Sequence, residues 1–382
     1  MNATLPFGLS NDEESLALLS DTIASALRSH EEAPEVLWDA LSREIGLGGA
    51  IISEQFGGMG GGGGALWVVM EALGRSPTWT PYLASTVLGA GALRHASGAL
   101  GEAILPRVVS GEVVLALAYL ESGRRNAIQP EITKAVLQNG AYRVNGAKVG
   151  SLGLDKADFV IFSAAGPGSG VTLFCVETNH PGLDRIGYAT IDGESAADAK
   201  LSDMEIPATN VIGEPGRGAE LLERLVDEGT AAACAAACGT MRAMIERTVE
   251  YCKQRRQFGK ALSDFQVLQH RLVDMHMAVE QATSLSQLAF AKLDSPALER
   301  REAVSGAKYL ASEACRTVSQ GAVQLHGGIG TTEELAIGRY FKRALMLEHL
   351  FGGADYHLQR YLEASGLKEI PAYAGADGAV EQ

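Results

Sequence analysis

Two short segments of this 382-residue chain combine residue types that suit an anionic ligand with a planar ring. The first is Arg255-Arg256-Gln257-Phe258-Gly259, at the expected end of a long helix. Its arginine offers forked donors that match a diphosphate, and its phenylalanine can pack against a ring. The alternative is a positive charge that stabilises a helix C-terminus beside a phenylalanine that anchors the core.

The second segment is Gln324-Leu325-His326-Gly327-Gly328-Ile329-Gly330, in which three of the last four residues are glycine. One glycine suffices to end a helix, so the others indicate the close approach of a ligand or of another chain. A tight turn between two helices is an equally weighted alternative. For His326, a buried and hydrogen-bonded histidine is the commoner case than a ligand contact.

Three regions of different periodicity must position these segments. Residues 1–112 have apolar residues at helical spacing and predict an N-terminal α-helical domain, with helices near 35–46, 64–75, 81–96 and 100–110. Residues 113–213 alternate with a period of two and predict a middle β domain, a small barrel or sandwich. Residues 214–382 predict a C-terminal four-helix bundle, with helices near 219–253, 263–292, 297–325 and 333–351.

Composition and charge exclude several classes of protein. The formal net charge of −14 argues against nucleic-acid binding, which depends on many Lys and Arg side chains. The chain has no run of 18 apolar residues and no N-terminus of the signal-peptide type, so we expect a cytoplasmic protein without a membrane segment. The five cysteines are scattered, and no further ligand completes a set around Cys234 and Cys238, so we expect reduced thiols and no metal site.

Two stretches are rich in small residues. Gly57–Gly64 lacks the Lys-Ser or Lys-Thr pair of a phosphate loop, so it predicts a turn ahead of a helix that starts near Leu66. Ala231–Cys238 predicts a helix that approaches a neighbouring helix closely.

An ordered set of motifs covers nearly the whole chain and resembles the acyl-CoA dehydrogenase family. The motifs are Phe56-Gly57-Gly58-Met59-Gly60, Asn145-Gly146-Ala147-Lys148, Arg255-x-x-Phe258-Gly259, Phe265-Gln266 and Gln324-x-x-Gly327-Gly328-x-Gly330. Tyr340–Arg343 and Phe351–His357 look like the small subunits of heteromeric acyl-CoA dehydrogenases, such as the pimeloyl-CoA type. The resemblance implies an α+β fold in which a middle β domain separates N-terminal helices from a four-helix bundle.

The resemblance also implies a reaction and its cofactor. Family members bind FAD, and a carboxylate removes the proton α to the thioester of an acyl-CoA substrate while the β-hydride passes to flavin N5. Electron-transfer flavoprotein is the expected acceptor. One subunit holds the flavin ring, and its neighbour holds the adenine-diphosphate (ADP) end. Matched to the motifs, the ADP-side residues are Arg255, Phe258, Gln266, Gln324, Gly327 and Gly328.

The chain departs from the family at the flavin ring and at the base. Two hydroxyl positions that contact the flavin are Leu120 and Leu152 here, with Ser151 adjacent to the second. The two family positions for the base are Phe351 and Gly229.

Carboxylates near the two base positions are Glu228, Asp227 and Asp355. For all three, a solvated or ion-paired side chain is the favoured interpretation. We retain Glu228 and Asp355 as candidate catalytic residues.

These departures lead to one principal hypothesis and two alternatives. In the first, the chain is a half-site subunit of an α2β2 enzyme and supplies the ADP side of the FAD site to a large, catalytic subunit. In the second, it is a complete homo-oligomeric dehydrogenase whose base has moved to Glu228 or Asp355. In the third, it is a flavin-free assembly subunit. The acyl group is not legible from the sequence, although fatty acid or steroid side-chain degradation is expected by analogy.

Overall fold

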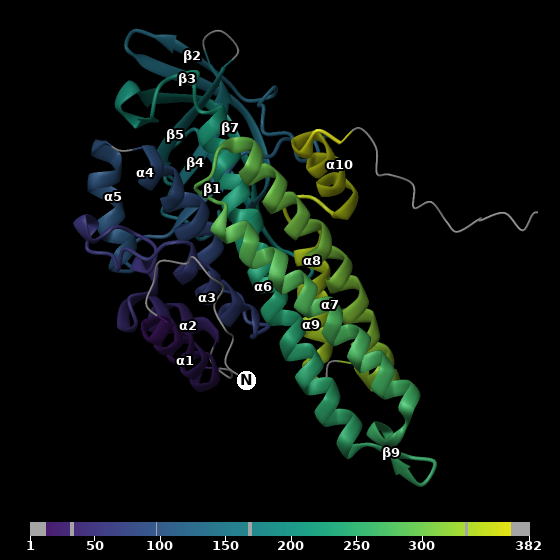
Figure 1. Ribbon diagram of the computed structural model, residues 1–382. Coiled ribbons are helices and arrows are strands. Elements are labelled where there is room, and N and C mark those ends of the chain that lie inside the picture. Colours follow the sequence, from purple (N-terminus) through teal and green to yellow (C-terminus); the bar gives the residue numbers. More distant parts are fainter. Residues whose placement is uncertain (1–12, 31–33, 97, 167–169, 333–334, 368–382) are drawn as a thin grey trace, which may run out of the picture.

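The computed structural model describes residues 13–30, 34–96, 98–166, 170–332 and 335–367 (Figure 1). Along the chain, a group of helices is followed by a β-sheet and then by a long helical bundle that projects away from the sheet. Within these residues, no helix is both long and apolar enough to cross a membrane.

The first helices form where charge and apolar spacing favour them. Glu13 and Glu14 lie in the first turn of α1 (Glu13–Ser29), where negative charge stabilises the helix dipole, and Leu16, Ile23 and Leu27 form its buried face. The main helical elements that follow are α2 (Pro34–Asp39), a π-helical segment (Ala40–Glu44), α3 (Gly63–Gly74), a second π-helical segment (Leu83–Gly89), α4 (Ala90–Ala96) and α5 (Ala99–Val109).

The predicted helix near 81–96 is π-helical in its first half, Leu83–Gly89. This segment packs against the first strand of the sheet, where the backbone N–H of Leu115 donates a hydrogen bond to Ser85 Oγ at 3.0 Å. Apolar spacing in the sequence does not distinguish so short a π-helical turn from an α-helix. The glycine run ahead of Leu66 forms a turn, as predicted, and α3 begins at Gly63.

Eight strands of the described chain form one sheet. They are β1 (Leu115–Ala118), β2 (Lys134–Gln138), β3 (Ala141–Leu152), β4 (Phe159–Ala165), β5 (Val171–Glu177), β6 (Leu183–Ala189), β7 (Ser195–Pro207) and β8 (Val211–Ile212). The order is β6-β7-β3-β2-β4-β5-β8, and β1 pairs in parallel with β4. Strand β6 escapes prediction because most of its side chains are exposed, so it has no apolar alternation.

Side chains on the two faces of the sheet belong to two different hydrophobic clusters. On one face, residues such as Tyr142, Phe162 and Phe174 form a cluster of their own. On the other face, Leu117 and Ile161 join the large cluster of the helices. The period of two in the strands therefore separates a core within the β region from an interface with the helices.

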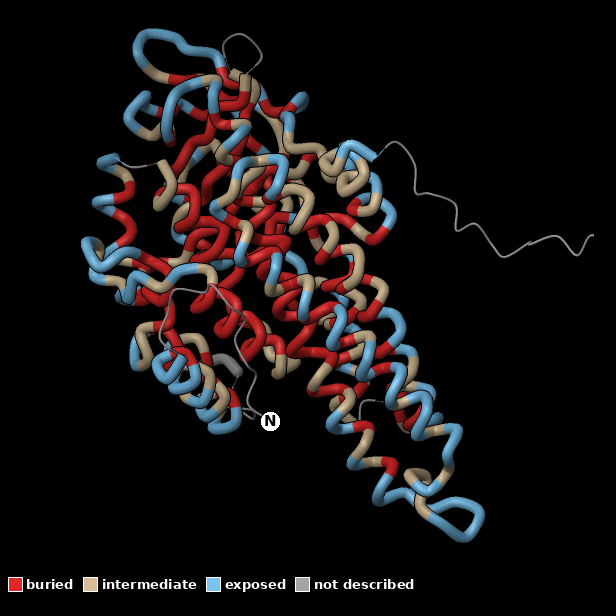
Figure 2. The backbone as a smooth tube through the Cα atoms, in the orientation of Figure 1, coloured by how far each residue is buried: buried red, intermediate tan, exposed pale blue. Residues whose placement is uncertain are grey.

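The C-terminal region is a helical bundle built on the longest helix, α6 (Ala219–Gln254). The later elements are the two-stranded hairpin β9 (Arg256–Gln257) and β10 (Lys260–Ala261), α7 (Gln266–Ala291), α8 (Ala297–His326), α9 (Ile337–His349) and α10 (Ala354–Ser365). The small residues Ala231–Cys238 of α6 are buried against α3, and a Cβ added to Gly74 of α3 would lie 2.1 Å from Ala236 O. The predicted close approach is therefore confirmed. Figure 2 shows a buried centre where α6 passes the other elements and an exposed outer tip.

The fourth predicted bundle helix, near 333–351, stops earlier than expected. Helix α9 ends at His349, and the backbone then turns through Phe351 (φ 61) and Gly352 (φ 110) into α10. Positive φ is unusual for phenylalanine, so a turn at Phe351 is not predicted from the sequence.

Candidate functional site

The Arg255–Gly259 segment forms the hairpin at the outer tip of the bundle (Figure 1). Phe258 (φ 50) and Gly259 (φ 82) are the central residues of its turn, and Gln257 pairs with Lys260 across it. A two-residue hairpin turn of this type needs two left-handed residues, which is costly for phenylalanine. The Phe258 side chain is nevertheless 92% exposed. An exposed ring on a strained backbone is a common feature of binding sites.

The Gln324–Gly330 segment begins on the last turn of α8 and ends in a short 3₁₀ turn, Gly327–Thr331. Gly327 has a φ of 68, so the chain leaves the helix through a left-handed residue. Gln324, Gly327 and Gly328 are exposed, whereas His326 is buried. The backbone of the loop is therefore open to a ligand on one side.

A contact between α6 and α8 brings the two segments together. The ring of Tyr251, one turn before Arg255, stacks on the ring of His326 with centroids 4.4 Å apart. The hydroxyl of Tyr251 also donates a hydrogen bond to the carbonyl oxygen of His326 at 3.2 Å. The hairpin and the glycine loop thus lie at the same end of the bundle, and Gln266 starts α7 beside the hairpin.

Gly229 and Phe351, far apart in the sequence, meet inside the molecule. A Cβ added to Gly229 would lie 3.0 Å from Phe351 Cζ and 2.7 Å from Leu88 Cδ2. The Phe351 side chain therefore fills the space that a side chain at Gly229 would need. Neither position offers a carboxylate, and the φ of 61 at Phe351 shows that this packing is maintained against backbone strain.

The residue before Gly229 on α6, Glu228, is a buried carboxylate surrounded by two arginines and a histidine. It accepts hydrogen bonds from Arg94 Nη2 at 2.8 Å, His95 Nε2 at 2.6 Å and Arg224 Nε at 3.2 Å. Burial alone would raise its pKa, but the hydrogen bond from His95 and the charge of Arg94 outweigh burial and lower the pKa to about 2. The charged form is stabilised and its oxygens are occupied, which does not favour proton abstraction.

Asp227 and Asp355 lie in contrasting surroundings. Asp227 is buried, and it accepts a hydrogen bond from Arg300 Nε at 2.9 Å while Arg360 Nη2 lies 2.6 Å from its other oxygen. Burial raises its pKa, although the charges of Arg360 and Arg300 act in the opposite direction. Asp355 lies in the first turn of α10 and is exposed. The three carboxylates weighed from the sequence are thus two buried ion-pair partners and one surface residue.

Models of the acyl-CoA dehydrogenase family match both helical regions of the chain. The N-terminal domain model matches residues 17–112, and the C-terminal domain model matches residues 216–365. The chain belongs to the acyl-CoA dehydrogenase family. Members of this family are FAD-dependent oxidoreductases that act on acyl-CoA.

Known relatives match over most of their length. The glutaryl-CoA dehydrogenase of Desulfococcus multivorans is 29% identical over 324 residues, which cover 82% of this chain and 83% of the relative. Among solved structures, the steroid ACAD Tcur3481–Tcur3483 is 28% identical with a TM-score of 0.84, covering 92% of this chain and 98% of that chain. The ChsE4–ChsE5 complex from Mycobacterium tuberculosis is 25% identical with a TM-score of 0.85, covering 96% and 100%.

The two sides of an FAD site fit this acyl-CoA dehydrogenase chain differently. The exposed Arg255 and Phe258 offer donors and a ring that suit an ADP group, and Gly328 is exposed as well, whereas the N–H of Gly327 already donates to Gln324 O and Val323 O. On the ring side, Leu152 pairs with Ala196 and belongs to the cluster that faces the helices. Its neighbour Ser151 points to the opposite face, because successive strand residues alternate, so its hydroxyl does not replace the missing one.

A buried ion pair between Glu121 and Lys148 stabilises the β region next to Leu120. Glu121 accepts backbone hydrogen bonds from Glu131, Ile132 and Thr133, and the ammonium of Lys148 lies 2.8 Å from its carboxylate. Burial opposes ionisation of Glu121, but the hydrogen bonds from the Ile132 backbone and from Lys148 lower its pKa to about 2. The backbone of the β region is therefore stabilised in this acyl-CoA dehydrogenase, even though Leu120 and Leu152 replace the two hydroxyl residues that contact the flavin in the family.

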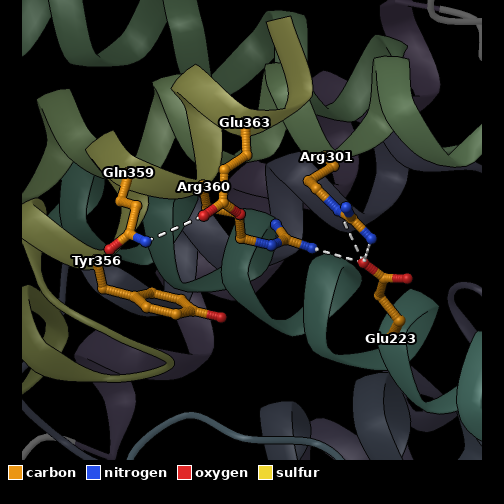
Figure 3. A pocket seen from close by; sticks show the side chains of 6 residues that line it. All are labelled: Glu223, Arg301, Tyr356, Gln359, Arg360 and Glu363. Atoms are coloured by element: carbon orange, nitrogen blue, oxygen red, sulfur yellow. Dashed lines mark hydrogen bonds and ion pairs between the residues drawn. The ribbon is translucent and has the colours of Figure 1, made fainter. Parts of the chain in front are cut away.

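A polar pocket of about 250 Å³ opens between α6, α8 and α10 (Figure 3). Its charged residues pair with one another: Glu223 accepts hydrogen bonds from Arg301 and Arg360, and Gln359 donates one to Glu363. Arg360 also reaches Asp227, two residues before Gly229. The charged side chains that line this pocket thus pair with one another.

Several partners of the candidate residues could not be found from the sequence. Arg94 and His95 are more than 130 positions from Glu228, so no local spacing links them. The contact between Tyr251 and His326 is likewise non-local, although Tyr251 lies one helical turn before Arg255, a spacing that could have drawn attention to it.

Proposed function

We propose that this chain is a half-site subunit of a heteromeric acyl-CoA dehydrogenase. In this proposal it supplies the ADP side of the FAD site to a large subunit, in an α2β2 assembly, and the large subunit supplies the flavin cradle and the base. The observation that carries the proposal is the packing of Phe351 on Gly229, where a Cβ would lie 3.0 Å from Phe351 Cζ. Both positions at which the family has a carboxylate are therefore occupied by apolar packing.

Glu228 and Asp355 do not fit the role of a relocated base in this proposal. Arg94, Arg224 and the hydrogen-bonded His95 hold Glu228 and lower its pKa to about 2, whereas a general base works best with a pKa near the working pH. Asp355 is exposed at the start of α10 and is not enclosed with the Gly229–Phe351 contact.

The length of α6 supports a site shared between two chains. The 26 residues from Gly229 to Arg255 span about 39 Å at the rise of an α-helix. A single dinucleotide does not bridge that separation. Leu152 lies near the Gly229 end of α6. A Cβ added to its neighbour Gly153 would lie 3.3 Å from Ala84, one turn before Leu88, the residue that a Cβ at Gly229 would meet. In this proposal, the ADP-side residues of this chain therefore bind an FAD whose flavin ring is held by the partner subunit.

The contribution of this chain to the reaction is binding and orientation. FAD, when bound, supplies the acceptor for the hydride that leaves the β-carbon of the acyl-CoA. Arg255 would neutralise the diphosphate with forked donors, and Phe258 would pack against a planar ring. Gln266, Gln324 and the Gly327–Gly328 backbone would complete the contacts. Electron-transfer flavoprotein remains our predicted acceptor, and the acyl group is selected by the partner's pocket.

Two of the similar solved structures favour a heteromer. The ChsE4–ChsE5 complex and the steroid ACAD Tcur3481–Tcur3483 are each named for two different chains. Both support the proposal of a second, non-identical subunit. The steroid ACAD also favours a bulky acyl group, such as a steroid side chain, as the first substrate class to test.

The proposal is tested by purifying the assembly from its source cells through a tag on this chain. We expect a second, larger acyl-CoA dehydrogenase subunit and bound flavin, read by mass and by absorbance. Arg255→Ala should lower the flavin content of that assembly without dissociating the subunits. A homo-oligomer of this chain that carries one FAD per chain and oxidises an acyl-CoA would overturn the proposal.

A further inference from the structure

The contact between Tyr251 and His326 lies between the two segments that we propose hold the ADP group. Tyr251 is joined to the hairpin by the helix itself, since the backbone N–H of Arg255 donates a hydrogen bond to Tyr251 O at 2.8 Å. A displacement of Tyr251 therefore moves Arg255 as well.

His326 is joined just as directly to the glycine loop. It is the last residue of α8, and Gly327 follows it with a φ of 68. Its carbonyl oxygen accepts the first hydrogen bond of the 3₁₀ turn Gly327–Thr331, and it also accepts one from the hydroxyl of Tyr251 at 3.2 Å. Tyr251 thus holds the end of α8 at the point where the glycine loop begins.

The orientation of the His326 ring is fixed from two sides. Nδ1 lies 2.8 Å from the carbonyl oxygen of Ala322, one turn earlier, so Nδ1 carries a proton and donates it. The ring face is covered by Tyr251 at a centroid separation of 4.4 Å and an interplanar angle of 25°. His326 is 6% exposed, so it is enclosed and not a direct ligand contact.

We propose that Tyr251 and His326 are positioning residues that set the separation between the Arg255–Gly259 hairpin and the Gly327–Gly328 loop, and thereby the affinity of the assembled enzyme for FAD. This inference rests on the proposed function, because it takes both segments as parts of one ADP site. Ligand donors must be held within a fraction of an ångström, so a loss of register weakens binding even where the fold survives.

The test compares two changes at Tyr251 with a matched change elsewhere. Tyr251→Phe removes the hydrogen bond and keeps the stack, and Tyr251→Leu removes both. Tyr361→Phe, on α10 away from the tip of the bundle, makes the same chemical change as a control. The assembly purified through this chain is stripped of flavin and titrated with FAD, and its thermal unfolding without FAD is recorded in parallel.

We expect Tyr251→Phe to weaken FAD binding about 5-fold, as the loss of one hydrogen bond implies. Tyr251→Leu should weaken it about 30-fold, because the ring contact is lost as well. The unfolding temperature of the flavin-free Tyr251→Phe assembly should fall only slightly, as the loss of one hydrogen bond implies, and both properties of Tyr361→Phe should match wild type. If Tyr251→Leu does not assemble, Tyr251→Phe and His326→Phe, which keeps a ring but loses Nδ1, decide the question.

The outcomes separate this inference from the proposed function. If Arg255→Ala weakens FAD binding and the Tyr251 variants do not, the ADP site is right and the positioning role is wrong. If the Tyr251 variants lower the unfolding temperature and leave FAD affinity unchanged, the contact is purely structural and the inference fails. If Arg255→Ala has no effect on FAD, the proposed function fails and this inference falls with it.

Discussion

Phe351 is the residue at which packing and backbone strain oppose each other most clearly. Its ring is enclosed against Gly229 and Leu88, and its φ of 61 is costly for any residue with a Cβ. Phe351→Ala should lower the free energy of unfolding by about 3–5 kcal/mol, because a buried ring is lost while the strain remains. Urea unfolding, followed by circular dichroism, measures this change.

Phe351→Gly is the matched variant, since it removes the same ring and also the Cβ. Glycine adopts positive φ readily, so this variant should be about 1 kcal/mol more stable than Phe351→Ala. If the glycine variant were instead the less stable of the two, the left-handed turn before α10 would not be strained, and the argument that packing is maintained at a cost would be wrong.

We expect a substitution of Glu228 to lower stability, whereas a substitution of a catalytic base would lower activity. Glu228→Gln removes the negative charge between Arg94, His95 and Arg224, and deprives the two half-buried guanidinium groups of this buried partner. We expect a loss of about 3–5 kcal/mol of unfolding free energy. Asp355→Asn, at an exposed position, should change neither stability nor flavin reduction in the assembly. A Glu228→Gln enzyme of normal stability that cannot reduce flavin would show that Glu228 is the base.

At the scale of elements, the β9–β10 hairpin displays Phe258 at the cost of an unfavourable turn residue. Asparagine is the residue preferred before glycine in such a turn. Phe258→Asn should therefore leave the unfolding temperature unchanged or slightly higher, while FAD affinity falls because the ring is gone. Equal FAD affinity in this variant and wild type would remove Phe258 from the proposed site.

An element can be predicted from the sequence when the residues that cause it are neighbours in the chain. The turn at Arg255–Gly259, the glycine loop and the small-residue face of α6 each depend on the types of a few consecutive residues. Their presence could therefore be predicted from the sequence. The π-helical turn at Leu83–Gly89, the early end of α9 and the exposed strand β6 depend on contacts or burial that local spacing does not record. The partners of Glu228 come from another region of the chain and were not predictable for the same reason. The predicted domain limits at 112/113 and 213/214 stay predictions.

For the whole molecule, buried ionisable groups make stability dependent on pH. The pKa values of Glu228 and Glu121 are lowered from 4.5 to about 2, and burial, with the charge of Lys308, lowers the pKa of His357 from 6.5 to about 3. In each case the unfolded chain binds a proton more readily than the folded one, so acid favours unfolding. The contribution of His357 should be lost as the pH falls from 6.5 towards about 3, and those of the carboxylates as it falls from 4.5 towards about 2. Urea midpoints measured across this range should decline steadily, and a constant midpoint down to about pH 4 would contradict the assignment.

Across the whole molecule, α6 separates Gly229 from Arg255 by about 39 Å, and we propose that only the Arg255 end takes part in binding FAD. The most direct test of the half-site account is anaerobic mixing of an acyl-CoA with this chain alone, reconstituted with FAD, and with its purified assembly. The account predicts that the assembly is bleached by the acyl-CoA, and that the chain alone neither retains FAD nor changes colour. Stoichiometric FAD in the chain alone, reduced by the acyl-CoA at the rate of the assembly, would contradict it.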